Sequence, residues 1–217
     1  MTDISILVSQ LKDQDWSVKR DTQDVITTLI RDNQQLASEV LNEMTRLLQD
    51  PNPHVRQEGL ETLSKIVKQH KELATQAALN QVKPLLQDNI GYIKTAAMVV
   101  MNRFVEQNKE LAPEVLYQLI SQLKENNQYA IGQLLRELDE LVRHNKELAS
   151  EACNQLRLLL KANDQNVRDN AVQALEELIE YETSFPREAI TLKVNPTSAT
   201  VDVSELGNSN DNNDGPL

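Results

Sequence analysis

The amino-acid sequence predicts an all-α protein in which about five helical hairpins stack into a solenoid. One apolar position recurs along the chain at a nearly constant interval, and two stretches with a helical apolar period accompany each copy. Subtraction of neighbouring residue numbers gives intervals of 37, 38, 37 and 37 residues. A period in this range indicates helical units that bury their apolar faces against one another. The five copies are Val18, Val55, Ile93, Ala130 and Val167.

The second helix of each predicted hairpin is clearest between Asp50 and Val67. Asp50-Pro51-Asn52-Pro53 cannot continue a helix, because proline lacks an N–H and restricts the residue before it. From Val55 onward the apolar residues follow a 3.6-residue period and line one side of a helix. Three further core positions repeat in all copies: Ile26, Leu63, Met101, Leu138 and Leu175; Leu29, Ile66, Phe104, Leu141 and Leu178; and Ile30, Val67, Val105, Val142 and Ile179.

A first helix precedes each of these segments, beginning with the apolar stripe of Ile4, Leu7, Val8 and Leu11. The later first helices are predicted near 36–48, 73–86, 111–123 and 148–160, each after a short turn. In the first hairpin, Thr22 and Gln23 replace the pair Gly59 and Leu60. We expect these two polar side chains to face water, since a terminal repeat needs a polar outer side.

In the first three hairpins, the turn between the two helices carries an acidic residue six positions before a basic one. This Asp…Val-Arg turn between two helices resembles the HEAT repeat family over about residues 2–182. The resemblance implies a right-handed α–α solenoid, a kinked first helix at Pro84, and bonds between the turn side chains of neighbouring units. Ile131 and Ala162 break the pattern, so the ladder is predicted to be discontinuous there. The predicted inter-repeat ladder comprises Asp13, Lys19, Asp50, Arg56, Asp88, Lys94 and Arg168.

The periodic pattern ends near residue 182, which predicts a helical repeat domain at 1–182. Ile190, Leu192 and Val194 alternate with polar residues, which favours an extended segment or short hairpin within 183–206. The final stretch, 207–217, lacks bulky apolar residues except the last and is predicted to be disordered.

Composition and motifs argue against an enzyme or a cofactor-binding protein. The sequence contains no glycine-rich phosphate loop and no Cys/His cluster with metal-ligand spacing. Its carboxylates fall at positions typical of solvated helix faces. The one cysteine, Cys153, falls on a predicted buried stripe and is best explained as a core residue. We therefore expect no catalytic residues, no metal and no cofactor.

Charge and hydropathy limit the kinds of partner and the cellular compartment that we expect for this protein. The net charge is −11, and residues 183–217 contribute −3 of it (two basic against five acidic residues), which leaves −8 for the predicted helical domain. That sign disfavours broad contact with nucleic acid. Residues 1–11 carry no basic leader, and the longest apolar run, Ala96–Met101, is too short to span a membrane. A cytoplasmic protein with no membrane segment is expected.

The second helices of a solenoid usually line its concave flank, where partners bind. The repeat places Thr27 and Asn102 among the exposed residues of that flank. Tyr92 and Tyr129 share one repeat position, and aromatic residues with an arginine nearby are typical of interface hot spots. Local packing is the simpler explanation for the same residues. The predicted partner-binding residues are Tyr92, Val99, Tyr129 and Arg136.

Three functions remain open at this level. The first is a non-enzymatic scaffold or adaptor that binds another protein through the concave face, as a monomer or a partner-bound subunit. The second is a nucleic-acid-binding protein similar to the HEAT-like DNA glycosylases, which would need a basic, aromatic-lined groove. The third is a lyase or chaperone subunit that resembles the phycobilin lyases, whose repeats are shorter and rich in Gly and Asp.

Overall fold

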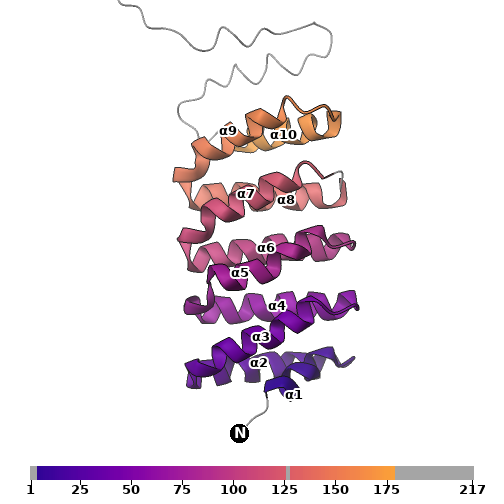
Figure 1. Ribbon diagram of the computed structural model, residues 1–217, viewed down its shortest axis with the longest axis vertical. Coiled ribbons are helices and arrows are strands. Elements are labelled where there is room, and N and C mark those ends of the chain that lie inside the picture. Colours follow the sequence, from indigo (N-terminus) through magenta and orange to yellow (C-terminus); the bar gives the residue numbers. More distant parts are fainter. Residues whose placement is uncertain (1–3, 126–127, 179–217) are drawn as a thin grey trace, which may run out of the picture. The chain divides into compact units, whose positions relative to one another are not determined.

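The computed structural model describes residues 4–125 and 128–178 (Figure 1). The chain divides into two units, Met1–Ser184 and Phe185–Leu217. The second unit lies wholly outside the described residues, as do the extended segment predicted within 183–206 and the disordered end predicted at 207–217.

The described part of the chain consists of ten α-helices and six short 3-10 helices, with no strand. This confirms the predicted all-α solenoid. In chain order the elements are α1 Ile4–Ser9, η1 Gln10–Lys12, α2 Trp16–Asp32, η2 Gln34–Leu36, α3 Ala37–Leu48, α4 Pro53–Gln69, η3 Lys71–Leu73, α5 Gln76–Val82, η4 Lys83–Gln87, α6 Gly91–Gln107, η5 Lys109–Leu111, α7 Ala112–Gln122, α8 Gln128–His144, η6 Lys146–Leu148, α9 Ala149–Leu159 and α10 Gln165–Leu178.

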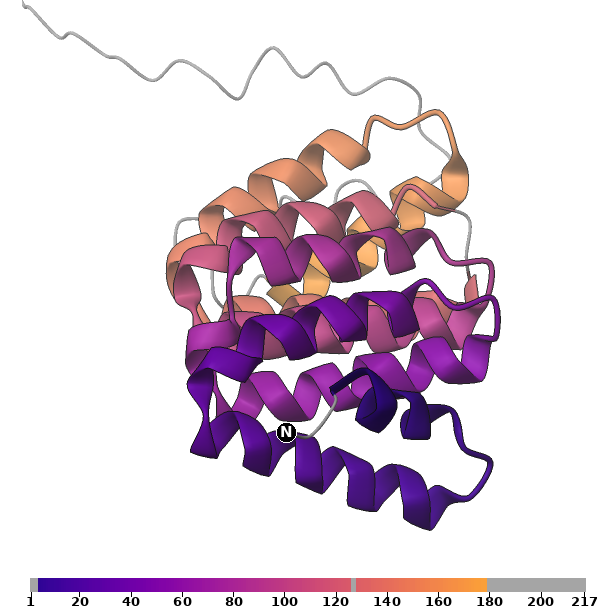
Figure 2. The same cartoon turned by 60° about the horizontal axis from the view of Figure 1, so that its bottom comes forward.

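The helices alternate between two layers as the chain proceeds (Figures 1 and 2). One layer holds the second helix of every hairpin, and α2 contacts α4, α4 contacts α6, α6 contacts α8 and α8 contacts α10. The other layer holds the first helices, among which α1 packs on α3, α3 on α5 and α7 on α9. Each hairpin therefore packs mainly on its immediate neighbours.

Polar residues at the turns fix where the second helices begin. The Asp15 carboxylate accepts the backbone N–H of Ser17 at 2.8 Å, and the Asn52 side chain accepts that of His54 at 3.0 Å. These bonds satisfy backbone donors that the first turn of a helix leaves free. Pro53 is the first residue of α4, a position that needs no N–H donor. At Lys83, the residue before Pro84, the first helix of the third hairpin changes from α to 3-10 geometry.

The predicted apolar seam is buried. Ile26, Leu63, Met101, Leu138 and Leu175 are each at most 3% exposed. Because each full burial of such a side chain contributes about 1.5–3 kcal/mol, this single repeat position gives every hairpin a strong reason to stack.

In the first hairpin, two residues that we expected to face water are buried. Thr22 and Gln23 are only 4% and 3% exposed, so the prediction that they face water is wrong. The Gln23 amide donates to Glu58 Oε1 at 2.6 Å and to Thr62 Oγ1 at 3.0 Å, and its oxygen accepts from Lys65. These partners lie on α4, so the second hairpin covers the Gln23 side chain and forms hydrogen bonds with its polar atoms.

Candidate functional site

The predicted binding surface is the exposed side of the layer formed by α2, α4, α6, α8 and α10, here called the second-helix face. Tyr92, in the first turn of α6, is 43% exposed. Its ring stacks on that of His54, in the first turn of α4, with centroids 6.4 Å apart and planes inclined by 23°. Two adjacent helices thus contribute one aromatic pair to this face.

An open cleft of about 430 Å³, here called the aromatic cleft, lies beside this pair. It spans α4, α6 and α8 and includes Tyr92 and Val99, two of the four residues predicted to bind a partner. Its lining combines aromatic, aliphatic and amide groups, a composition suited to a peptide segment rather than to a polyanion. The lining residues are His54, Gln57, Tyr92, Thr95, Ala96, Val99 and Gln133.

The other two predicted residues lie on α8. Arg136 is exposed and does not line the aromatic cleft. The side chain of Tyr129 is outside the described part of the structure, so its place at the cleft stays a prediction. His54 was not predicted, although the repeat aligns it with Tyr92 and Tyr129.

The acidic and basic residues of the predicted ladder lie in or near the turns inside the hairpins. Arg56 Nε donates to Asp88 Oδ2 at 2.7 Å, and Arg56 Nη2 donates to Asp88 Oδ1 at 2.9 Å. Arg56 Nη1 also donates to the carbonyl oxygens of Asp50 and Pro51. Arg168 makes the same kind of contact as Arg56 Nη1: its Nη1 donates to the carbonyl oxygens of Ala162 and Asn163.

The remaining ladder residues have different partners. Lys12, rather than Lys19, pairs with Asp50 at 2.7 Å, and hydrogen bonding from Lys12 holds the pKa of Asp50 below its usual value. Lys19 instead lies 3.4 Å from Glu58. Asp13 accepts the backbone N–H of Asp15 within its own turn. The half-buried Lys94 forms no ion pair within the described residues.

A buried polar contact joins α6 and α8 beyond the aromatic cleft. Asn102, 7% exposed, donates from Nδ2 to the carbonyl oxygen of Glu137 at 2.7 Å and to Glu137 Oε2 at 2.8 Å. Gln133 donates to the other Glu137 oxygen. Burial raises the pKa of Glu137 against the lowering effect of these hydrogen bonds. Thr27 is also buried, so the expectation that Thr27 and Asn102 are exposed is wrong.

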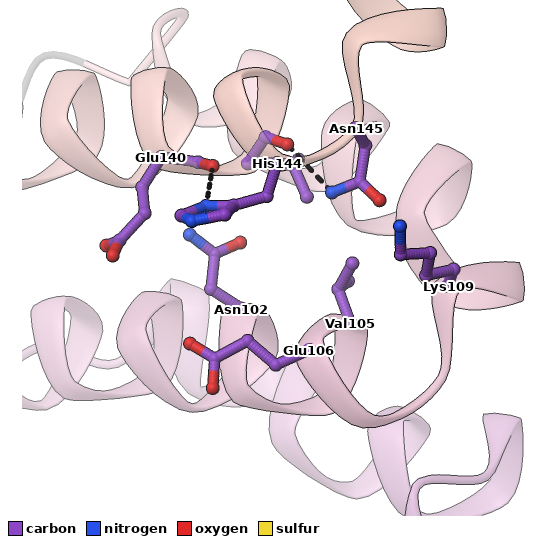
Figure 3. Close-up of a pocket in the computed structure, with 8 residues that line it drawn as sticks. Asn102, Val105, Glu106, Lys109, Glu140, His144 and Asn145 are labelled. Carbon is purple, nitrogen blue, oxygen red and sulfur yellow. Dashed lines mark hydrogen bonds between the residues drawn. The ribbon is translucent and has the colours of Figure 1, made fainter.

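A second cavity of about 200 Å³, here called the end cavity, lies between the C-terminal parts of α6 and α8 (Figure 3). His144 Nδ1 lies 2.8 Å from the carbonyl oxygen of Glu140, and Asn145 Nδ2 donates to the carbonyl oxygen of Leu141 at 2.8 Å. None of its residues was predicted to form a site. The lining residues are Asn102, Val105, Glu106, Lys109, Glu140, Leu141, His144 and Asn145.

Within 4–125 and 128–178, no group of three or more His, Cys, Asp or Glu side chains could hold a metal ion. Cys153 is 2% exposed on α9. None of the described helices is both long enough and apolar enough to cross a membrane.

Comparison with known proteins identifies the kind of fold. Residues 4–195 match the family model described as the adaptin N terminal region. No curated protein matches the chain significantly.

Several solved structures have a similar fold. The N-terminal domain of MAST/Orbit superposes with a TM-score of 0.60 at 16% identity, over 88% of this chain and 94% of that one. A structure on TOG–tubulin binding specificity gives a TM-score of 0.53 at 15% identity, over 82% and 77%. The C-terminal fragment of the Chaetomium thermophilum cohesin loader SCC2 gives 0.54 at 13% identity, over 76% of this chain and 14% of that one. These likenesses and the family match confirm a HEAT-like repeat fold.

Proposed function

The chain belongs to the adaptin N-terminal region family, and from this premise we propose that it is a non-enzymatic scaffold that binds a partner protein through the second-helix face. The observation that carries the proposal is Tyr92, a large aromatic side chain that is 43% exposed at the edge of the aromatic cleft. Tyrosines at the centre of such surfaces often supply much of the binding energy. Solenoid repeat proteins commonly use an extended face of this kind.

The charge of the chain favours a protein partner over a nucleic acid. The net charge is −11, whereas nucleic-acid binding depends on a basic stripe that contacts phosphates. The TOG structure with a similar fold is described in terms of tubulin binding, which supports the class of partner and no particular protein. The sequence contains a single cysteine, which supports the proposal that the protein acts in the reducing environment of the cytoplasm.

The proposal is tested by affinity capture with three forms of the full chain: wild type, Tyr92→Ala and Tyr117→Ala. Tyr117 is the matched control, because it is 59% exposed but lies on α7 in the layer of first helices. Loss of a hot-spot tyrosine costs about 2 kcal/mol or more, which corresponds to roughly a thirtyfold weaker complex.

We expect Tyr92→Ala to lose partners that wild type and Tyr117→Ala both retain, as measured by quantitative mass spectrometry of the captured proteins. Adding Tyr129→Ala should deepen the loss if that side chain joins the cleft. Equal recovery with all forms would show that the partner binds elsewhere. Recovery of nucleic acid that falls as salt is raised would favour the nucleic-acid alternative. Copurifying visible absorbance would favour the lyase alternative.

A further inference from the structure

The first described hairpin exposes apolar side chains at repeat positions that are buried in the others. Val25 lies on α2, at one end of the described stack, and is 44% exposed (Figure 1). The residues at its repeat position in the other hairpins are at most 4% exposed: Thr62, Val100, Glu137 and Ala174. Leu29, one turn further along α2, is half-buried. The residues at its repeat position are at most 2% exposed: Ile66, Phe104, Leu141 and Leu178.

The last described hairpin has a matching residue at the opposite end of the stack. Val172, on α10, is half-buried. The residues at its repeat position in the other hairpins are at most 3% exposed: Gln23, Leu60, Met98 and Leu135. In those hairpins the next unit covers this position. The surface around Val25 is here called the α2 end, and the surface around Val172 is called the α10 end.

A contact within the molecule shows that these two repeat positions meet when one hairpin stacks on the next. The Gln23 amide on α2 donates to Thr62 Oγ1 on α4 at 3.0 Å. Gln23 holds the repeat position of Val172, and Thr62 holds that of Val25. A second copy that placed its α2 on α10 in the same geometry would bring the two valines together and remove both from water, which is favourable.

Ion pairs at the turns give this stacking a direction. Lys12 Nζ lies 2.7 Å from Asp50 Oδ2, and Arg56 Nε lies 2.7 Å from Asp88 Oδ2. In both pairs the basic residue belongs to the earlier hairpin and the aspartate to the hairpin that follows it.

The two ends of the stack carry the separate halves of such a pair. Lys161 and Arg168, in the last described hairpin, hold the basic repeat positions of the two ion pairs. Asp13, in the first hairpin, holds the acidic position. None of these three side chains forms an ion pair within the described residues. The α10 end is therefore basic where the α2 end is acidic.

We propose that copies of this chain associate end to end, with the α2 end of one copy stacked on the α10 end of another. A second copy fits because valine meets valine and base meets acid, in the arrangement that already joins hairpins within the chain. The interface is heterologous, so each added copy leaves one end exposed and the assembly grows as an open chain. This inference goes beyond the proposed function, since it concerns the ends of the stack and not the second-helix face.

Sedimentation velocity of the full chain over a wide range of concentrations tests the proposal. The average mass of wild type should rise steadily with concentration, as expected for open-ended growth. Val25→Asp and Val172→Asp should each raise the concentration needed for association by about tenfold or more, because the contact would bury a carboxylate beside a valine. Circular dichroism checks that each variant keeps its helices. Lys161→Glu, which changes an exposed residue, blocks the α10 end independently if Val172→Asp does not fold.

An equimolar mixture of the two valine variants identifies the direction of stacking. Val25→Asp keeps an intact α10 end, and Val172→Asp keeps an intact α2 end. These two ends can associate, and both outer ends of the resulting complex are blocked. We expect a complex with one copy of each variant that does not grow further as the concentration rises. Association of two α2 ends with each other would instead persist in Val172→Asp alone.

Asp13→Asn tests the contribution of charge while keeping the bonding of the turn. The amide oxygen can still accept the backbone N–H of Asp15, as the carboxylate does at 2.8 Å. Loss of the charge should weaken association by roughly two- to fivefold, as is typical of exposed ion pairs. Asp24→Asn is the matched control and should have no effect, because its repeat position stays exposed within the stack. The exposed residues at that position are Glu61, Arg136 and Gln173.

The proposal is wrong if wild type stays monomeric at every concentration, or if either valine variant associates as wild type does. It is also wrong if the mixture contains no complex of the two variants. None of these measurements requires a partner protein, so their result is separate from the capture experiment on Tyr92.

Discussion

Two glycines inside helices show how the environment of a residue decides its role. Gly59 lies on α4, where an added Cβ would approach Leu47 Cβ to 3.0 Å and Leu48 Cδ2 to 3.2 Å. Gly132 lies on α8, and an added Cβ would meet nothing within 4 Å. The first glycine lets two helices of one hairpin pack closely, whereas the second makes no comparable contact.

We expect Gly132→Ala to raise the free energy of unfolding by about 0.5–1 kcal/mol, since glycine is a poorer helix former than alanine. Gly59→Val should lower it by about 1–3 kcal/mol, because the branched side chain overpacks the contact with α3. Urea denaturation followed by circular dichroism measures both changes. Shifts of the same sign in the two variants would contradict this account of the hairpin contact.

Glu137 predicts a pH dependence of stability. Burial raises its pKa above the ordinary glutamate value of 4.5, so the folded state binds a proton more tightly than the unfolded state does. The protonated side chain therefore favours the fold, and this contribution decreases as the pH rises from about 4.5 through the raised value. We expect the stability of wild type relative to Glu137→Gln to fall over that window, measured by denaturation at a series of pH values. A relative stability that is flat or rises there would show that the hydrogen bonds from Asn102 and Gln133 outweigh burial.

At the scale of the elements, two ion pairs between successive hairpins differ in burial. The side chains of Arg56 and Asp88 are 11% and 6% exposed and meet through two hydrogen bonds. The side chain of Lys12, which pairs with Asp50, is 47% exposed. Solvent screens the second pair, so its strength should be small even though its distance is as short.

Arg56→Ala should lower the free energy of unfolding by about 3–5 kcal/mol, because it leaves Asp88 buried without its cation. Lys12→Ala should cost less than about 1 kcal/mol. Thermal and urea unfolding of both variants beside wild type provide the comparison. If the two losses were alike, burial would not be what distinguishes these contacts.

The elements themselves could largely be predicted from the repeat, because apolar spacing and turn residues are local properties. The period located the second helices, and the buried seam from Ile26 to Leu175 followed from it. Thr22 and Gln23 were assigned wrongly because residue type does not reveal the partners that bury them. Gln23 donates to Glu58 and Thr62 on α4, and the Thr22 hydroxyl donates to Gln10 within its own hairpin.

The candidate site could be predicted only in part, for a related reason. Tyr92 and Val99 were found because they stand out at surface positions of the repeat. The end cavity was missed because its lining residues come from α6, η5 and the end of α8, which are distant in sequence. No pattern along the chain records which side chains of separate helices meet.

At the scale of the helical unit, packing runs mainly from each hairpin to the next. The second helices contact one another in chain order, from α2 with α4 through to α8 with α10. Stability in such a fold is close to a sum of repeat and nearest-neighbour terms. A defect in one terminal hairpin should therefore loosen that end more than the other.

Ile26 and Leu175 test this directly, since they occupy the same repeat position at opposite ends and are 0% and 3% exposed. Substitution of either by alanine removes buried apolar contacts and should cost about 2–5 kcal/mol locally. We expect Ile26→Ala to reduce amide hydrogen-exchange protection in α1–α4, and Leu175→Ala to reduce it in α8–α10, as measured by mass spectrometry. The two maps should be near opposites, because the disturbance must cross several hairpin interfaces to reach the far end. Equal loss of protection along all helices in both variants would show instead that the hairpins unfold as one cooperative body.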